Sequence, residues 1–216
     1  GNPVDGGYRS NRRSVYFDDK SGTQIIDRFA PNGHFYDQDG VFVNLGTNRF
    51  VEIKGKWYYL NNSGQIIKGS HIINGAQVYF DENGIQIKGD FDKENRYYDE
   101  HTGKLVTNRF VTVKDKNYFI GAKGIHVKVA TLIDGKEYYF DQDTGDMWKD
   151  RFRQIDKQDY RGVAPGSKVG IAWLYYQADG SVASGLTNTP DGRTLMFNTY
   201  NHEQVKGKLV NTDGSN

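Results

Sequence analysis

Short runs of alternating apolar and polar residues recur along the whole chain, and each run enters or leaves a polar turn. The stretch YFDENGIQIKGDF, from Tyr79 to Phe91, shows the pattern: two aromatic residues, a polar turn that ends in glycine, and an alternating run. Alternation with a period of two is typical of a half-buried strand, and glycine between two such runs indicates a β-hairpin. The pattern therefore predicts hairpins and no sustained helix.

The hairpin pattern is an internal repeat of roughly 20 residues, the length of one supersecondary unit in many repeat proteins. Aligning the aromatic pairs gives two columns. The first column contains Tyr16, Phe35, Tyr59, Tyr79, Tyr97, Phe119, Tyr139, Tyr175 and Met196. The second column contains Phe17, Tyr36, Leu60, Phe80, Tyr98, Ile120, Phe140, Tyr176 and Phe197. A longer repeat is superimposed, because TNRFVEIKGKWYYL from Thr47 returns as TNRFVTVKDKNYFI from Thr107.

Stacking of these hairpins predicts the fold. One hairpin alone is marginally stable in water, whereas stacked copies bury one another's aromatic faces. We therefore expect an all-β fold, a repetitive β-hairpin solenoid. The expected organisation is a lead-in over residues 1–14, regular repeats over 15–152, an irregular insertion over 153–172 and further, divergent repeats over 173–216.

Alternation also predicts which side chains share a face of the hairpin. Pairing Phe80 with Ile85 across the turn places Tyr79 opposite Gln86. The apolar face is then Val78, Phe80, Ile85 and Ile87, and the mixed face is Gln77, Tyr79, Gln86 and Lys88. We expect the apolar face to form the core and the mixed face to remain accessible.

Other copies repeat the mixed face with substitutions. The copy from Gly55 presents Trp57, Tyr59, Ile66 and Lys68, and the copy from Asp115 presents Asn117, Phe119, His126 and Lys128. Tyr139 is the ring of the following copy, and the last copy has Gln204 and Lys206 with Met196 in the first column. The candidates for binding among these positions are Trp57, Tyr59, Lys68, Phe119, His126, Lys128, Tyr139, Gln204 and Lys206.

A flat ring beside an amide and an ammonium suits an uncharged carbohydrate. The C–H face of a sugar lies against a ring, while its hydroxyls need the donors and acceptors that Gln and Lys provide. Any one of these rings taken alone is more often structural, because a tyrosine on a sheet commonly covers a neighbouring strand. The recurrence of ring, amide and ammonium on one face favours binding.

Composition excludes several classes of protein. The net charge is +1, from 28 basic and 27 acidic side chains that are interspersed, so no basic stripe for nucleic acid exists. No apolar run approaches the length needed for membrane insertion. The absence of cysteine excludes a disulfide scaffold, a thiolate metal site and a cysteine nucleophile.

Catalytic and metal-binding patterns are also missing, so we expect neither an enzyme nor a cofactor. Most Asp and Glu residues stand in turns, where Asp favours the backbone geometry, which disfavours a small glycoside hydrolase. The five histidines lack metal-ligand spacing. The stretch DQDTGD, from Asp141 to Asp146, begins like a calcium loop but lacks the terminal Glu, which favours a simple turn.

The run from Val78 to Val111 contains an aromatic pair, an NG turn, Q-x-K-G, a second aromatic pair, a turn glycine and N-R-F. It resembles the glucan-binding repeats of glucansucrases from lactic acid bacteria and, more loosely, choline-binding and toxin cell-wall-binding repeats. The resemblance is strong over Tyr16 to Phe152 and weaker beyond. It implies a non-catalytic module of a secreted, extracellular or wall-associated glucansucrase. The implied partners are an α-glucan, such as dextran or an isomaltooligosaccharide, and the catalytic domain of the parent enzyme.

Carried over by position, the family pocket corresponds to Tyr79, Gln86 and Lys88, with Tyr97 and Tyr98 as a second wall. Two alternatives stay open at this point. Choline, a quaternary cation, needs an aromatic cage usually rich in Trp, whereas this chain has three Trp and a lysine at the pocket edge. The same hairpins could also serve as a structural spacer or a cell-wall adhesion module without glucan pockets.

Overall fold

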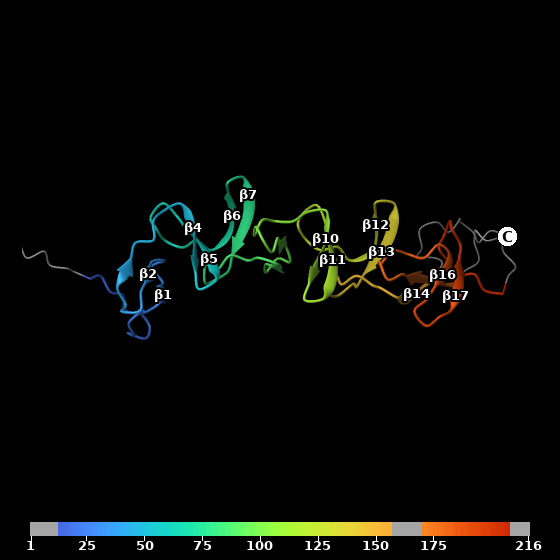
Figure 1. The fold of residues 1–216 in the computed structure, drawn as a ribbon, viewed down its shortest axis with the longest axis horizontal. Helices are drawn as coiled ribbons and strands as arrows, with labels where there is room; N and C mark the ends of the chain where they lie inside the picture. The colour runs from blue at the N-terminus through green and yellow to red at the C-terminus, as the bar shows by residue number, and fades with distance from the viewer. Residues whose placement is uncertain (1–12, 157–169, 208–216) are drawn as a thin grey trace, which may run out of the picture. The chain divides into compact units, whose positions relative to one another are not determined.

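The computed structural model describes residues 13–156 and 170–207, and within these ranges it contains strands and turns but no helix. The strands are β1 (Arg28–Phe29), β2 (Phe35–Tyr36), β3 (Phe42–Val43), β4 (Arg49–Ile53), β5 (Lys56–Leu60), β6 (Gly69–Ile73), β7 (Ala76–Phe80), β8 (Asp90–Phe91), β9 (Tyr97–Tyr98), β10 (Arg109–Val113), β11 (Lys116–Ile120), β12 (Val129–Ile133), β13 (Lys136–Phe140), β14 (Arg151–Asp156), β15 (Ile171–Tyr176), β16 (Gly185–Asn188) and β17 (Thr194–Phe197). Figure 1 shows them as short hairpins in chain order. The all-β hairpin fold is confirmed, and no helix long and apolar enough to cross a membrane occurs in the two ranges.

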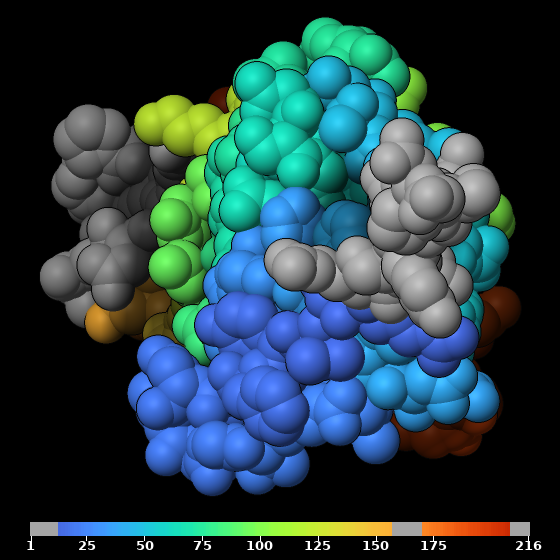
Figure 2. Space-filling model, turned by 90° about the vertical axis from the view of Figure 1, so that its left-hand side faces the viewer, coloured from blue at the N-terminus to red at the C-terminus, as the bar shows by residue number. Residues whose placement is uncertain are grey.

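The chain divides into two compact units, residues 1–93 with 98–105 and residues 94–97 with 106–216. The first unit contains the sheet β1-β2-β3 and the hairpins β4–β5 and β6–β7. The second unit contains the hairpins β10–β11, β12–β13, β14–β15 and β16–β17. In Figure 2 the β6–β7 hairpin of the first unit, in teal, projects at the top of the view.

Four hairpins close through a two-residue turn in which both residues have positive φ, as a type I′ turn requires. These turns are Lys54–Gly55, Asn74–Gly75, Lys114–Asp115 and Asp134–Gly135. A type I′ turn matches the twist of its flanking strands, and each of these turns carries a ladder of five residue pairs. Placing the main hairpin turn at DENG was therefore wrong, since only an isolated bridge spans that turn.

A tail after each polar turn joins one hairpin to the preceding one. After DENG, the N–H of Ile87 donates to the carbonyl of Tyr79 in the same hairpin, at 2.8 Å. The N–H of Gln86 donates to the carbonyl of Trp57 in the preceding hairpin, at 2.7 Å. Equivalent pairs of bonds in the second unit run from Trp148 to Tyr139 with Met147 to Asn117, and from Ala183 to Tyr175 with Val182 to Glu137. The tail thus satisfies its backbone groups by bridging two copies, which makes stacking part of the hydrogen-bond network.

The predicted register across the DENG turn is wrong by one residue. Phe80 pairs with Gln86 and not with Ile85. The reason is the turn itself: the Asp81 carboxylate accepts the N–H of Asn83 at 2.8 Å and of Ile85 at 2.9 Å, which adds one residue to the loop. The same shift pairs Ile120 with His126, so the two predicted faces do not form.

One residue at the end of each second strand forms the core. These residues are Leu60, Phe80, Tyr98, Ile120, Phe140, Tyr176 and Phe197, and each is 0% exposed. They belong to the second column of the repeat, whose first two members differ, since Tyr36 is 5% exposed and Phe17 is 56% exposed. Each such side chain contributes about 1.5–3 kcal/mol through burial, which a lone hairpin would lack.

Part of the expected irregular segment 153–172 is regular. Residues 153–156 belong to β14, and residues 171–172 belong to β15, which pairs with β14 from Arg151↔Tyr176 to Asp156↔Ile171. Residues 157–169 lie outside the described ranges, as do residues 1–12 of the expected lead-in and residues 208–216.

Val129, at the start of β12, has a φ of 59°, where a β-branched residue is strained. Gly69 occupies the same place at the start of β6, with a φ of 79°. Because Val129 is exposed and buries little, Val129→Gly is expected to raise the free energy of unfolding by about 1 kcal/mol. Urea unfolding measures this change. Val111→Gly, in the middle of β10, should lower stability, and a loss for Val129→Gly as well would contradict the strain argument.

Candidate carbohydrate-binding site

A half-buried tryptophan of β5 lies beneath the ammonium of a lysine from the next tail. The Nζ of Lys88 is 4.8 Å from the centre of the Trp57 ring and donates to the carbonyl of His101 at 3.3 Å. The bond from Gln86 to the Trp57 carbonyl fixes the tail beside that strand. The ring of one hairpin therefore lies beside the Lys of the following copy, and the backbone of Gln86 is bonded to the same tryptophan.

Gln86 is buried, at 7% exposure. Its Nε2 has no hydrogen-bond partner among the residues that the structure describes. Its amide packs against Gly103, where a Cβ would lie 2.2 Å from Nε2, so the glycine is needed for this close approach. A buried N–H without a partner costs about 1–3 kcal/mol. Because this nitrogen is fully buried, the Gln86 amide packs against the turn glycine as the His126 ring does against Gly145.

The first-column ring beside Gln86 in the sequence is mostly covered. Tyr79 is 9% exposed, and its ring centre lies 6.0 Å from that of Tyr98. Gln77 donates to Ser70 Oγ at 3.1 Å, and Tyr98 donates to Asp92 at 3.0 Å. Tyr97 is buried in the second unit. Of the residues carried over from the family, Gln86 and Lys88 thus adjoin an accessible ring, and that ring belongs to Trp57.

A second copy of this arrangement occurs within the second unit. The N–H of Gln204 donates to the carbonyl of Trp173 at 2.8 Å, as Gln86 does to Trp57. The Nζ of Lys206 lies 5.7 Å from the centre of the half-buried Trp173 ring. Sequence reasoning grouped Gln204 and Lys206 with Met196 and missed Trp173. The signal was present, since Trp57 and Trp173 stand two positions before the first column in KWYYL and AWLYY.

Joints without this tryptophan have no comparable platform. Lys68 is exposed, but the carbonyl that pairs with its tail, through Ile66, belongs to Gly33. Tyr59 packs edge-on against Phe50, with ring centres 5.0 Å apart. The tails at Leu105, Met147 and Val182 pair with Gln77, Asn117 and Glu137.

The predicted group of the copy from Asp115 is also structural. Phe119 packs against Phe110, with ring centres 4.9 Å apart, and Lys128 donates to the carbonyl of Asp143 at 2.9 Å. The ring of His126 lies against Gly145, where a Cβ would stand 2.1 Å from Cδ2. Burial, and secondly the charge of Lys128, lower the pKa of His126 below 6.5.

Protonation of His126 is expected to destabilise the fold. Because its folded pKa is lowered, the unfolded chain binds more protons below about pH 6.5, so stability falls as the pH drops through that value. His126→Gln should reduce the loss of stability between about pH 7 and pH 5 in urea unfolding. The exposed His101→Gln serves as the control, and an equal pH dependence in both variants would contradict the assignment.

The ring of Tyr139 has two close side-chain neighbours. The guanidinium of Arg153 lies 4.1 Å from its centre, and Trp148 lies 4.5 Å away. Arg151 covers Trp148 in turn, at 3.7 Å. Tyr139 and Trp148 therefore pack against each other with their ring planes inclined by 59°.

The DQDTGD stretch forms a turn. The Asp141 carboxylate accepts the N–H groups of Asp143 and Thr144, both at 3.0 Å, and these bonds lower its pKa. Among the described residues, no group of three or more metal-ligating side chains occurs. The Asp141 carboxylate therefore stabilises the turn.

Comparison with protein families gives matches over the middle of the chain. The family model for the choline-binding repeat matches residues 67–110 and 111–152, and a cell wall binding repeat matches residues 48–66. Residues 48–152 are choline-binding-type repeats. Repeats of this type are binding modules and are not catalytic.

Similar proteins include two streptococcal glucosyltransferases. The chain is 37% identical over 128 residues to Glucosyltransferase-I of Streptococcus downei, which covers 56% of this chain and 8% of the relative. It is 32% identical over 166 residues to Glucosyltransferase-S of Streptococcus mutans serotype c, over 63% of this chain and 11% of the relative. The chain therefore spans about a tenth of these relatives, and its choline-binding-type repeats are related to repeats of glucosyltransferases.

Choline binding protein F from Streptococcus pneumoniae has a similar fold. Its structure aligns with a TM-score of 0.52 and 19% identity, over 94% of this chain and 81% of that chain. This likeness supports a repeated-hairpin architecture.

Proposed function

We propose that the chain is a non-catalytic module that binds α-glucan chains of the dextran type at two equivalent sites. One site consists of Trp57, Gln86 and Lys88, and the other of Trp173, Gln204 and Lys206. The observation that carries the proposal is the occurrence of this arrangement once in each unit, with the same bond from the tail to the tryptophan carbonyl.

The chemistry of the site fits a glucosyl unit. The indole offers a flat apolar surface for the C–H face of the sugar, the backbone of Gln86 holds the tail beside the indole, and the ammonium offers three donors. Two such sites on one chain bind one polymer with higher avidity than either alone. Individually weak sites therefore suffice to hold a glucan.

Native gel electrophoresis with and without dextran tests the proposal. The wild-type chain is expected to be retarded by dextran and not by an equal concentration of a polymer without sugar rings, such as polyethylene glycol. Equal mobility in both gels would contradict glucan binding and would leave a structural spacer as the better account.

Choline is the rival ligand, because the matching family model is that of the choline-binding repeat. A quaternary ammonium bound at either indole would lie beside the ammonium of Lys88 or Lys206. Two cations on one ring repel each other, so the lysines favour a neutral ligand.

We further propose that the module belongs to an extracellular glucansucrase, where it would hold product polymer near the catalytic domain. The relationship to streptococcal glucosyltransferases supports this placement. Detection of the parent protein in culture medium or on the cell wall would test it.

A further inference from the structure

The second unit contains a cavity at a joint that lacks the tryptophan. Its volume is about 640 Å³, within the range of small-molecule sites. Val182 donates to the carbonyl of Glu137 at 2.8 Å, the bond that Gln86 makes to Trp57 elsewhere. At this joint Glu137 replaces the tryptophan and Ser184 replaces the lysine, so the cavity cannot act as a third copy of the same site.

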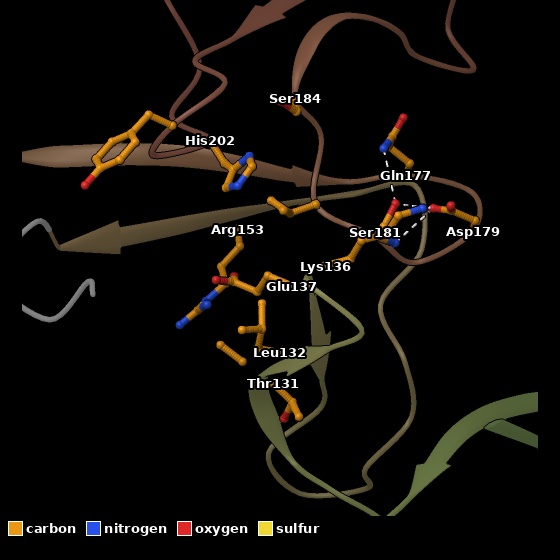
Figure 3. A pocket seen from close by; sticks show the side chains of 14 residues that line it. Thr131, Leu132, Lys136, Glu137, Arg153, Gln177, Asp179, Ser181, Ser184 and His202 are labelled. Atoms are coloured by element: carbon orange, nitrogen blue, oxygen red, sulfur yellow. Dashed lines mark hydrogen bonds between the residues drawn. The ribbon is translucent and has the colours of Figure 1, made fainter. Parts of the chain in front are cut away.

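The floor of the cavity is a charged pair joined by a buried hydroxyl. Tyr176 donates to Glu137 Oε1 at 2.8 Å and accepts from Arg153 at 3.3 Å. Figure 3 shows Glu137 and Arg153 together, with Lys136 beside them and His202 on the opposite side. The second Glu137 oxygen has no hydrogen-bond partner among the described residues. The pair thus offers an acceptor and several donors side by side.

Other residues that line the cavity are either polar and already hydrogen-bonded, or apolar and exposed. Gln177, Ser181 and Asp179 are hydrogen-bonded to one another, as the dashed lines of Figure 3 show. Leu132 is 70% exposed and Tyr200 is 85% exposed, and both border the cavity. These two side chains supply C–H and ring surface next to the charged pair.

We propose that this cavity is a separate site for a neutral, hydroxyl-rich ligand, a short saccharide, which it binds through Glu137 and Arg153 with Tyr200 at the rim. A carboxylate and a guanidinium side by side match vicinal hydroxyls, which accept and donate at once. Glu137 and Asp179 offset the charges of Arg153 and Lys136, so the lining has no net preference for an anion or a cation. Because hydrogen bonds replace the ring platform, this site depends more on the arrangement of hydroxyls than the tryptophan sites do.

The test follows the methyl resonances of Leu132 in the full chain, labelled at leucine methyl groups, during titration with isomaltotriose, acetate and tetramethylammonium. A saturable shift with isomaltotriose alone is expected. Glu137→Gln should weaken the apparent affinity about tenfold, since a bond to a charged group is lost, while the exposed Glu82→Gln should not. Tyr200→Ala, at an exposed position, should weaken it as well.

Three results would overturn the proposal: no saturable shift with the saccharide, an equal shift with either ion, or unchanged affinity in both Glu137→Gln and Tyr200→Ala. This inference can fail alone, if dextran retards the chain but Leu132 does not respond. The proposed function can fail alone, if Leu132 responds while dextran gives no retardation.

Discussion

Replacing Trp57 and Trp173 together by alanine is expected to abolish retardation of the chain in dextran gels. Each single replacement removes one ring platform and should weaken oligosaccharide binding at its own site by about 2 kcal/mol, roughly thirtyfold. Each single variant also loses the avidity that two sites give on one polymer, so retardation should fall steeply in both. The effect is large because the ring is the part of the site that sugar C–H groups contact.

The matched control is Phe17→Ala, which removes an exposed ring that is 56% accessible and belongs to neither site. Its retardation should equal that of the wild type. Circular dichroism of the double variant shows whether the hairpins persist, since both tryptophans are half-buried. Undiminished retardation of a folded double variant would contradict the assignment.

Replacing Lys88 and Lys206 by alanine is expected to change the ligand preference. Loss of the ammonium removes the positive charge beside the rings of Trp57 and Trp173, so a quaternary ammonium can bind at each ring without repulsion. Choline should then quench tryptophan fluorescence saturably, which it should not do in the wild type. Dextran retardation should weaken, because each site loses a donor.

Lys56→Ala with Lys116→Ala provides the control, because both lysines are exposed and begin the strands β5 and β11. This pair should leave choline and dextran responses as in the wild type. Saturable choline quenching of the wild-type chain would contradict the view that its own lysines exclude the cation.

The buried positions of the fold were predictable from the sequence. The second column is apolar in every copy, and the period alone indicates a repeated core position, as Phe80 and Phe140 illustrate. Burial follows composition and period, which are local properties of the sequence. The absence of helix followed from the same alternation.

The register could not be predicted by assigning alternate side chains to the two faces of the hairpin. Alternation favours pairing Phe80 with Ile85, because that register keeps the apolar residues on one face. The observed pairing with Gln86 depends on two bonds to the Asp81 side chain. The type I′ turns were predictable from pairs such as Asn74–Gly75, but the longer polar turns were taken as the hairpin turns instead.

The composition of the site was predictable only in part. In the proposed site, Gln86 and Lys88 follow from the local Q-x-K pattern, whereas Trp57 comes from the preceding hairpin. That pairing depends on how successive copies stack, through the bond from Gln86 to the Trp57 carbonyl. A pattern within one copy cannot contain it, and this is why Tyr79 was chosen in place of Trp57.

The indole N–H resonances of the three tryptophans test the central claim most directly. The chain is labelled with ¹⁵N-tryptophan, assigned by single Trp→Phe variants, and titrated with isomaltotriose. Trp57 and Trp173 are expected to shift saturably, while Trp148, packed between Arg151 and Tyr139, stays in place. A shift confined to Trp148, or no shift of any indole, would contradict a glucan site built on the two tryptophans.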